Sequence, residues 1–221
     1  MNLICRKTLS IICSFAVVLG LSACSSSGDA KKDAAKESAP LVESEGDYSG
    51  KWNDFSVLFD ENQIVFPCKG SEFERATGFS FKDNRELSPN EKVFDIEMKA
   101  PTKKVGKLMR VTVGVINQTN DKISIKDADV WSVDFEAKRG YEASPAVGII
   151  GDIVLGKSKI EDVETAYGVP LEDNIWSDNG GSYLSYDYPT EDDDVMSLSF
   201  LNGVLNSVKF SRYSIGGADE Q

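Results

Sequence analysis

The chain has 221 residues, and its 24 lysines and arginines stand against 36 aspartates and glutamates, which gives a formal net charge of −12. Phosphate backbones repel a protein of this sign, so nucleic acid is a poor candidate partner. The chain contains no histidine, and this excludes Ser-His-Asp and Cys-His catalysis and most zinc sites.

Residues 1–23 have the pattern of a secretory signal. Arg6 and Lys7 precede an apolar run over 9–21 that is too short to span a bilayer. The run ends in Leu21-Ser22-Ala23-Cys24, which resembles the lipobox of bacterial lipoproteins. The resemblance implies cleavage before Cys24 and lipid on its sulfur, and two or more acyl chains would anchor the protein stably in a membrane. The alternative is an ordinary secretory signal that happens to contain a cysteine.

The charge of the mature chain would be more negative still. Cleavage before Cys24 removes two cations and no acid, so the balance moves from 24 − 36 = −12 to 22 − 36 = −14. We therefore expect an extracytoplasmic protein that is attached to the membrane through its lipid and not through a basic patch. Residues 24–50 contain almost nothing apolar to bury, which predicts a solvated, flexible linker.

The cysteines leave no possibility of an intramolecular disulfide. Cys5 and Cys13 would be removed with the signal and Cys24 would carry lipid, so Cys68 is the remaining thiol. It follows Pro67 and the apolar Ile64-Val65-Phe66. This setting favours a buried small hydrophobic residue over a reactive thiol.

From residue 51 onward the apolar residues alternate in period two, and two short helical signatures interrupt the alternation. Each signature has a serine N-cap, an acid three residues later as in a capping box, and a glycine stop. These residues are Ser71, Glu74 and Gly78 in the first signature and Ser158, Glu161 and Gly168 in the second. The predicted inward helix positions are Phe73 and Ala76, then Ile160, Val163 and Tyr167.

A run of predicted strands follows each helix. The ranges are 92–98, 107–117 and 122–136, then 182–188, 195–201 and 204–213. Asn202-Gly203 joins the last two as a two-residue hairpin turn. The sequence therefore predicts an α+β fold of two tandem repeats, 51–140 and 141–221, each a short helical segment packed on an antiparallel sheet.

The second half also carries a family resemblance. The segments Gly-Lys-Ser-Lys-Ile-Glu-Asp-Val-Glu-Thr-Ala-Tyr-Gly-Val-Pro (156–170), Tyr-Leu-Ser-Tyr (183–186) and Phe-Leu-Asn-Gly-Val-Leu-Asn-Ser-Val (200–208) are similar to small-lipoprotein repeats of the SmpA/OmlA type. The helix-plus-sheet duplication looks like the tandem fold of β-lactamase inhibitory proteins. Both resemblances imply a membrane-tethered, non-catalytic module that binds another protein across its sheets.

Strict alternation assigns the two faces of each sheet. The predicted core residues are Leu184, Tyr186, Tyr188, Met196, Leu198, Phe200, Val208 and Phe210, and in the first half Met109, Val111, Val113, Trp131, Val133 and Phe135. The opposite face of the second half is predicted to carry Tyr183, Ser185, Ser197, Ser199, Lys209, Ser211 and Tyr213. We interpret this face as a candidate partner-binding surface, since tyrosine supplies contact area and serine adaptable hydrogen bonds. An ordinary half-exposed antiparallel sheet would show the same alternation.

The acids do not form a recognisable catalytic or metal site. The loop Glu191-Asp192-Asp193-Asp194 lacks the ligand spacing of a calcium loop, so we expect a solvated hairpin tip. Asp95 and Glu97 alternate with apolar neighbours, which puts them on a solvent face.

The expected function is that of a non-catalytic protein-binding or envelope-assembly module with no metal and no cofactor. Its partners would be the membrane, through lipid on Cys24, and a protein of the cell envelope. The alternatives are a small-ligand-binding or sensing lipoprotein and a carboxylate-dependent hydrolase.

Overall fold

The computed structural model describes residues 55–178 and 180–216, which belong to one compact unit. The predicted signal and linker, residues 1–50, lie outside the described residues. Within the described ranges, no helix has the length and apolar character that crossing a bilayer requires.

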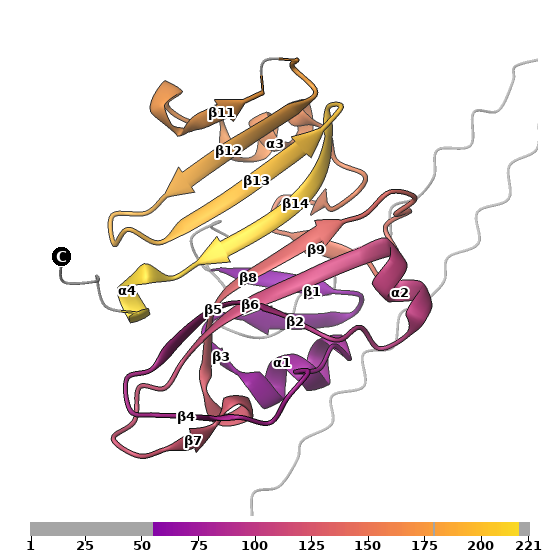
Figure 1. Ribbon diagram of the computed structural model, residues 1–221. Coiled ribbons are helices and arrows are strands. Elements are labelled where there is room, and N and C mark those ends of the chain that lie inside the picture. The colour runs from indigo at the N-terminus through magenta and orange to yellow at the C-terminus, as the bar shows by residue number, and fades with distance from the viewer. Residues whose placement is uncertain (1–54, 179, 217–221) are drawn as a thin grey trace, which may run out of the picture. The chain divides into compact units, whose positions relative to one another are not determined.

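A large antiparallel sheet holds strands from both predicted halves (Figure 1). Its strand order is β11-β12-β13-β14-β8-β6-β5, and β3 also pairs with β8. The bounds are β3 Cys68–Lys69, β5 Lys92–Glu97, β6 Met109–Ile116, β8 Asp129–Ala137, β11 Ile175–Ser177, β12 Tyr183–Pro189, β13 Val195–Leu201 and β14 Val204–Ser211. The halves meet where β14 pairs with β8, so their strands form one sheet. The fold is α+β, as predicted, and mainly antiparallel.

A smaller sheet and two helices pack against one face of the large sheet. The order of the small sheet is β10-β9-β1-β2, with β1 at Ser56–Phe59, β2 at Asn62–Val65, β9 at Val147–Ile149 and β10 at Ile153–Val154. The helices are α1, Gly70–Thr77, and α3, Ile160–Tyr167. The shorter elements are β4 Glu86–Leu87, α2 Lys103–Leu108, β7 Ile123–Ser124, η2 Ile125–Asp127, η3 Glu172–Asn174 and α4 Tyr213–Gly216.

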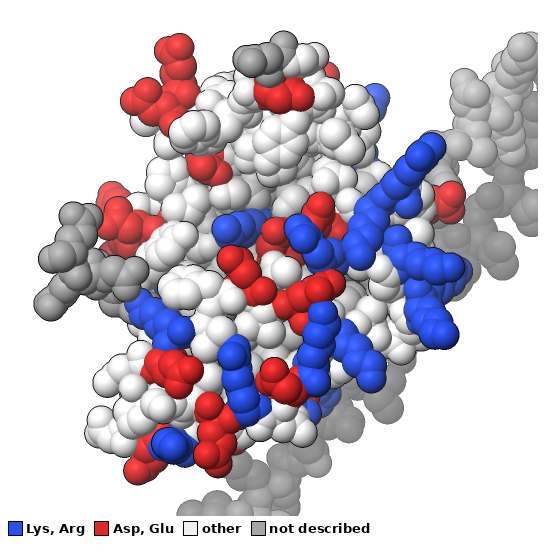
Figure 2. Space-filling model, in the orientation of Figure 1, with Lys and Arg blue, Asp and Glu red and all other residues white. Residues whose placement is uncertain are grey.

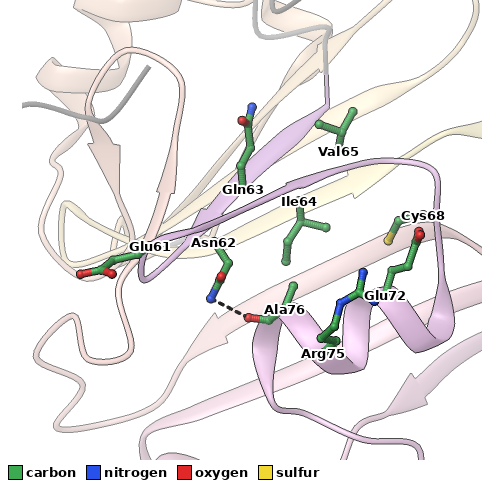
Figure 3. A pocket seen from close by; sticks show the side chains of 9 residues that line it. All are labelled: Glu61, Asn62, Gln63, Ile64, Val65, Cys68, Glu72, Arg75 and Ala76. Carbon is green, nitrogen blue, oxygen red and sulfur yellow. Dashed lines mark hydrogen bonds between the residues drawn. The ribbon is translucent and has the colours of Figure 1, made fainter. Parts of the chain in front are cut away.

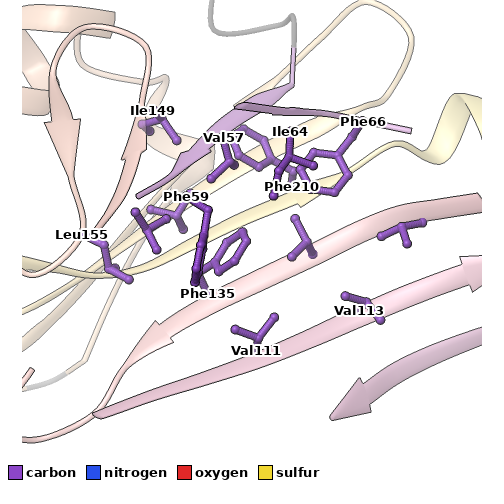
Figure 4. Close-up of a cluster of buried hydrophobic side chains, with 14 of the residues drawn as sticks. Val57, Phe59, Ile64, Phe66, Val111, Val113, Phe135, Ile149, Leu155 and Phe210 are labelled. Carbon is purple, nitrogen blue, oxygen red and sulfur yellow. The ribbon is translucent and has the colours of Figure 1, made fainter. Parts of the chain in front are cut away.

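Aromatic rings fill the space between the two sheets (Figure 4). Phe59 of β1 lies 6.0 Å from Phe135 of β8, and Phe55 lies 5.5 Å from Phe210 of β14, measured between ring centroids. Phe73 of α1 is fully buried and lies 6.2 Å from Phe135. Such pairs add about 0.5–1.5 kcal/mol each beyond the burial of their area. The predicted core face of the second half is confirmed, because all eight of its residues belong to this cluster or pack on it.

Both helices begin at a different residue from the predicted one. The N-caps are Lys69 and Lys159, and the carboxylates of Glu72 and Asp162 accept their backbone N–H groups at 3.1 and 2.8 Å. The predicted caps Ser71 and Ser158 are therefore wrong. The Ser158 hydroxyl instead accepts the N–H of Val154 at 3.0 Å, which fixes the turn before the helix. Phe73 and Val163 are buried as predicted, and Gly78 ends α1 with φ of +72°.

Local side-chain caps interrupt two of the predicted strands. The Thr102 hydroxyl accepts the N–H of Val105 at 3.2 Å and starts α2, so the strand predicted from 107 begins only at 109. The Ser124 hydroxyl accepts the N–H of Lys126 at 3.3 Å and starts η2. The range 122–136 is consequently broken before β8. At the C-terminal end of β14 the chain turns into α4, which contains Tyr213.

A β-bulge in β8 moves Trp131 to the face opposite the core. Val130 pairs with Val115 and Ser132 with Gly114, which leaves Trp131 as the extra residue. Trp131 is only 3% exposed, yet it does not belong to the core cluster. The prediction that Trp131 lies on the core face of the first half is therefore wrong, because its side chain is buried on the opposite face.

Candidate functional site: the open face of the large sheet

The face of the large sheet that points away from the core is called the open face here. Cross-strand pairing defines its members, because directly paired residues point to the same side. They include Glu97, Arg110, Thr112, Ser132, Asp134, Glu136, Trp176, Tyr183, Ser185, Asp187, Ser197, Ser199, Leu201, Ser207, Lys209 and Ser211. Figure 2 shows acidic and basic side chains interleaved over β14, β8 and β6, and a mostly uncharged surface over β12 and β13.

Hydroxyl groups bridge neighbouring strands in the uncharged part. The Ser185 and Ser199 hydroxyl oxygens lie 3.1 Å apart, and the Tyr183 hydroxyl donates to Ser199 at 3.0 Å. The Ser132 and Ser211 hydroxyl oxygens lie 3.2 Å apart. These bridges satisfy the hydroxyls within the sheet and leave Ser185, Ser199 and Ser211 buried. Tyr183 remains 40% exposed. The predicted serines therefore form a polar sheet surface, called the floor here, and most of their hydroxyls are not free to donate to a partner.

Exposed apolar side chains stand at one end of this floor. Trp176 of β11 pairs with Ser185 and is 64% exposed, and Leu201 pairs with Tyr183 and is 46% exposed. Sequence reasoning missed Trp176 because its strand has only three residues, too few to show alternation.

A second aromatic group lies at the other end. The indole of Trp131 packs between Phe94 of β5, at 5.3 Å, and Tyr213 of α4, at 5.5 Å. Gly114 makes room for it, since a Cβ there would come within 3.1 Å of the indole nitrogen. Phe94 and Tyr213 remain about half exposed. The Trp131 Nε1 is buried, and the described residues offer it no hydrogen-bond acceptor.

Charged residues occupy the middle of the open face. Lys209 pairs across the β8–β14 junction with Asp134, whose carboxylate accepts a hydrogen bond from Ser207 at 2.6 Å. Burial raises the pKa of Asp134, the Ser207 hydrogen bond lowers it, and the neighbouring Glu136 raises it further. Glu136 is held by Arg110 at 2.5 Å. The cations of Lys209 and Arg110 lower the pKa of Asp134 again. A carboxylate whose pKa is perturbed by burial and by specific charges is a common feature of functional sites.

A pocket of about 510 Å³ lies elsewhere, between β2 and α1 (Figure 3). Asn62 closes one side by donating to the Ala76 carbonyl at 3.1 Å, and Cys68 lies at the opposite side. Burial, with the carboxylates of Glu72 and Asp129, raises the pKa of Cys68 to about 12. Its thiol stays protonated and is a poor nucleophile. Glu72 is already engaged as the capping residue of α1, so the pocket offers little chemistry beyond weak polar contacts.

The acidic loop after β12 is only partly solvated. Glu191, Asp192 and Asp193 are exposed, but Asp194 is 2% exposed and accepts from Arg212 Nε at 2.9 Å. The predicted solvated tip is therefore wrong for Asp194, which ties the loop to the end of β14. Asp95 and Glu97 are exposed as predicted. Across 55–178 and 180–216, no three His, Cys, Asp or Glu side chains are grouped closely enough to hold a metal ion.

Comparison of the chain with protein-family models, with curated proteins and with solved structures finds no match. The resemblances to SmpA/OmlA-type repeats and to β-lactamase inhibitory proteins thus stay predictions.

Proposed function

We propose that this chain is a lipid-tethered, extracytoplasmic and non-catalytic module that binds another protein of the cell envelope through its open face. The observation that carries the proposal is the arrangement of that face. Exposed apolar side chains stand at both ends of a sheet surface that carries small polar residues and, in its middle, charged residues. Aromatic side chains are enriched in protein interfaces, and antibody paratopes combine them with small adaptable polar residues such as serine.

The chemistry of the remaining residues favours binding over catalysis. The chain has no histidine, and the thiol of Cys68 is held protonated. Asp134 and Glu136 lie on a flat sheet face and not in an apolar cleft of the kind that positions a substrate between two carboxyls. A small ligand in the pocket between β2 and α1 would meet one guanidinium, from Arg75, and two carboxylates.

We also propose that the fold arose by tandem duplication. The sequence Val130-Trp-Ser-Val-Asp-Phe135 in β8 parallels Leu205-Asn-Ser-Val-Lys-Phe210 in β14, and each strand has its bulge at its third residue. The pairing is symmetric about Asp134 and Lys209, and β1 and β9 are likewise neighbours in the small sheet. The duplication makes one continuous surface from two short units, which suits recognition of a large partner.

Affinity capture from detergent-solubilised envelope tests the binding surface. Trp176→Ala and Tyr183→Ala remove exposed rings, so the free energy of unfolding should change by about 0.5 kcal/mol or less. Loss of an anchor should weaken capture of the partner by about tenfold or more. Val65→Ala is the matched control, since Val65 is 54% exposed on β2. Equal capture by all three variants would contradict the proposal.

A further inference from the structure

The cations of this protein are unevenly distributed along the chain, so a basic patch forms although the net charge of −12 made one unexpected. No lysine or arginine occurs from residue 160 to residue 208, a stretch that contains α3, β11, β12 and β13. By contrast, the twelve residues 99–110 contain five cations and no acid. In Figure 2 one group of blue side chains lies at the end of the molecule where α2 lies, others alternate with red side chains over the lower half, and the surface over β12 and β13 carries almost none.

The fold adds two more cations to this cluster from another part of the chain. Lys138 and Arg139 follow the end of β8, and the Lys138 amine donates to the Gly106 carbonyl of α2 at 3.0 Å. The backbone N–H of Lys138 also donates to the carbonyl of Leu108 at 2.7 Å. We call the resulting surface the α2 patch, and it consists of Lys99, Lys103, Lys104, Lys107, Arg110, Lys138 and Arg139.

The cations of the α2 patch are exposed and largely uncompensated. All seven side chains are exposed, and within the described ranges only Arg110 has a carboxylate at ion-pair distance, that of Glu136. Because the amines are already in water, contact with an anionic surface requires little desolvation. Several like charges held together by the fold repel one another, and an anionic partner would relieve that repulsion.

We propose that the α2 patch docks on the phosphate headgroups of an anionic membrane and turns the acidic second half away from that surface. This inference rests on the proposed lipid tether for its choice of partner, because the tether keeps the domain close to the membrane. A linker with the composition of residues 24–50 has a root-mean-square reach of about 30 Å. A weak patch is then sufficient, since tethering supplies a high local concentration. The anionic surface would repel the negatively charged second half, and this repulsion would orient the domain.

Vesicle flotation with the mature chain, residues 24–221 carrying Cys24→Ser, tests the patch independently of both the signal and lipidation. We expect binding to phosphatidylcholine vesicles that contain phosphatidylglycerol, weakening as salt is raised, and no binding to pure phosphatidylcholine. Lys103→Glu, Lys104→Glu and Lys107→Glu together should weaken the binding on the order of 100-fold, since each lysine near such a surface contributes about fivefold. The matched control reverses the same amount of charge at the exposed Arg85, Lys122 and Lys157.

Each outcome of this experiment decides for or against the inference. Loss of binding in the α2 variant but not in the control supports it. Equal loss in both variants would show a nonspecific effect of net charge and would overturn it. Absence of vesicle binding by the parent chain, or tighter binding to duplex DNA than to the anionic vesicles, would also overturn it. The tether is judged separately, by the acyl mass on Cys24, so failure of the patch leaves it standing.

Discussion

The buried carboxylate of Asp194 should be one of the most sensitive positions in the molecule. It accepts hydrogen bonds from Arg212 Nε at 2.9 Å, from the Ser214 N–H at 2.9 Å and from the Ser214 hydroxyl at 3.0 Å. Arg212 in turn donates to the Phe66 carbonyl at 3.0 Å and lies 5.4 Å from the ring centroid of Phe55. One ion pair therefore joins the loop before β13, the end of β14 and the small sheet.

The expected loss of stability in Asp194→Asn follows from the hydrogen bonds that the substitution removes and those that it keeps. The amide keeps the shape and can still accept from Ser214, but it loses the charge-assisted bond to Arg212, which is worth about 1.5–3 kcal/mol. Removing one partner of a fully buried pair costs about 3–5 kcal/mol. The Arg212 side chain is 29% exposed and can recover some hydration. We therefore expect a destabilisation of about 2–3 kcal/mol.

Urea denaturation followed by circular dichroism measures this change. With a slope of about 1–3 kcal/mol per molar urea, the midpoint should fall by about 1–2 M. Asp192→Asn is the matched control, because Asp192 is an exposed acid of the same loop and should change stability by about 0.5 kcal/mol or less. Equal midpoints for the two variants would refute the reasoning. Strictly additive effects of Asp194→Asn and Arg212→Gln would refute the coupling between the two side chains.

Three further predictions concern other parts of the chain. Burial raises the pKa of Asp134 in the folded state, so its contribution to stability is complete in acid and is lost as pH rises through the folded pKa. Asp134→Asn can still accept from Ser207 and should raise the free energy of unfolding at pH 7 but not at pH 3. Urea denaturation at the two pH values measures this, and a gain at both would contradict it. Val163→Asp places a carboxylate at a fully buried helix position and should lower stability by several kcal/mol, whereas a melting temperature within two degrees of the parent would show that α3 does not pack as described. Cys24→Ser should leave uncleaved precursor or release the protein from the membrane fraction, and a parent protein whose intact mass shows no acyl group would rule out the lipid anchor.

The sequence predicts this fold best where local periodicity decides the structure. Alternation assigns Met196, Leu198 and Phe200 to the core, and all three are buried. It fails at Trp131, because the bulge that turns this residue outward depends on how β8 pairs with β6. A bulge adds one residue to a single strand, and an alternating pattern in the sequence does not show where that extra residue lies.

Pairing between distant segments is the other part that the sequence does not reveal. The junction of β8 with β14 joins residues more than seventy positions apart, and no local signal specifies it. The burial of Asp194 likewise depends on Arg212, which reaches it only once β13 and β14 are paired. The sequence predicted the open face as a serine-rich surface with two tyrosines. It did not predict that Trp176 lies at one end of this face, or that Trp131 packs with Phe94 and Tyr213 at the other, because these positions depend on the three-dimensional arrangement.

Site-specific photocrosslinking in living cells tests the binding role of the open face most directly. A photoreactive phenylalanine analogue would replace Ser197 of β13 or Thr112 of β6, which lie on the open face with β14 and β8 between them. The same analogue at the exposed Ser71 or Lys157 serves as the control. The account predicts one shared protein adduct from both open-face positions and none from the controls. Adducts from the control positions alone, or no adduct from the open face, would contradict it.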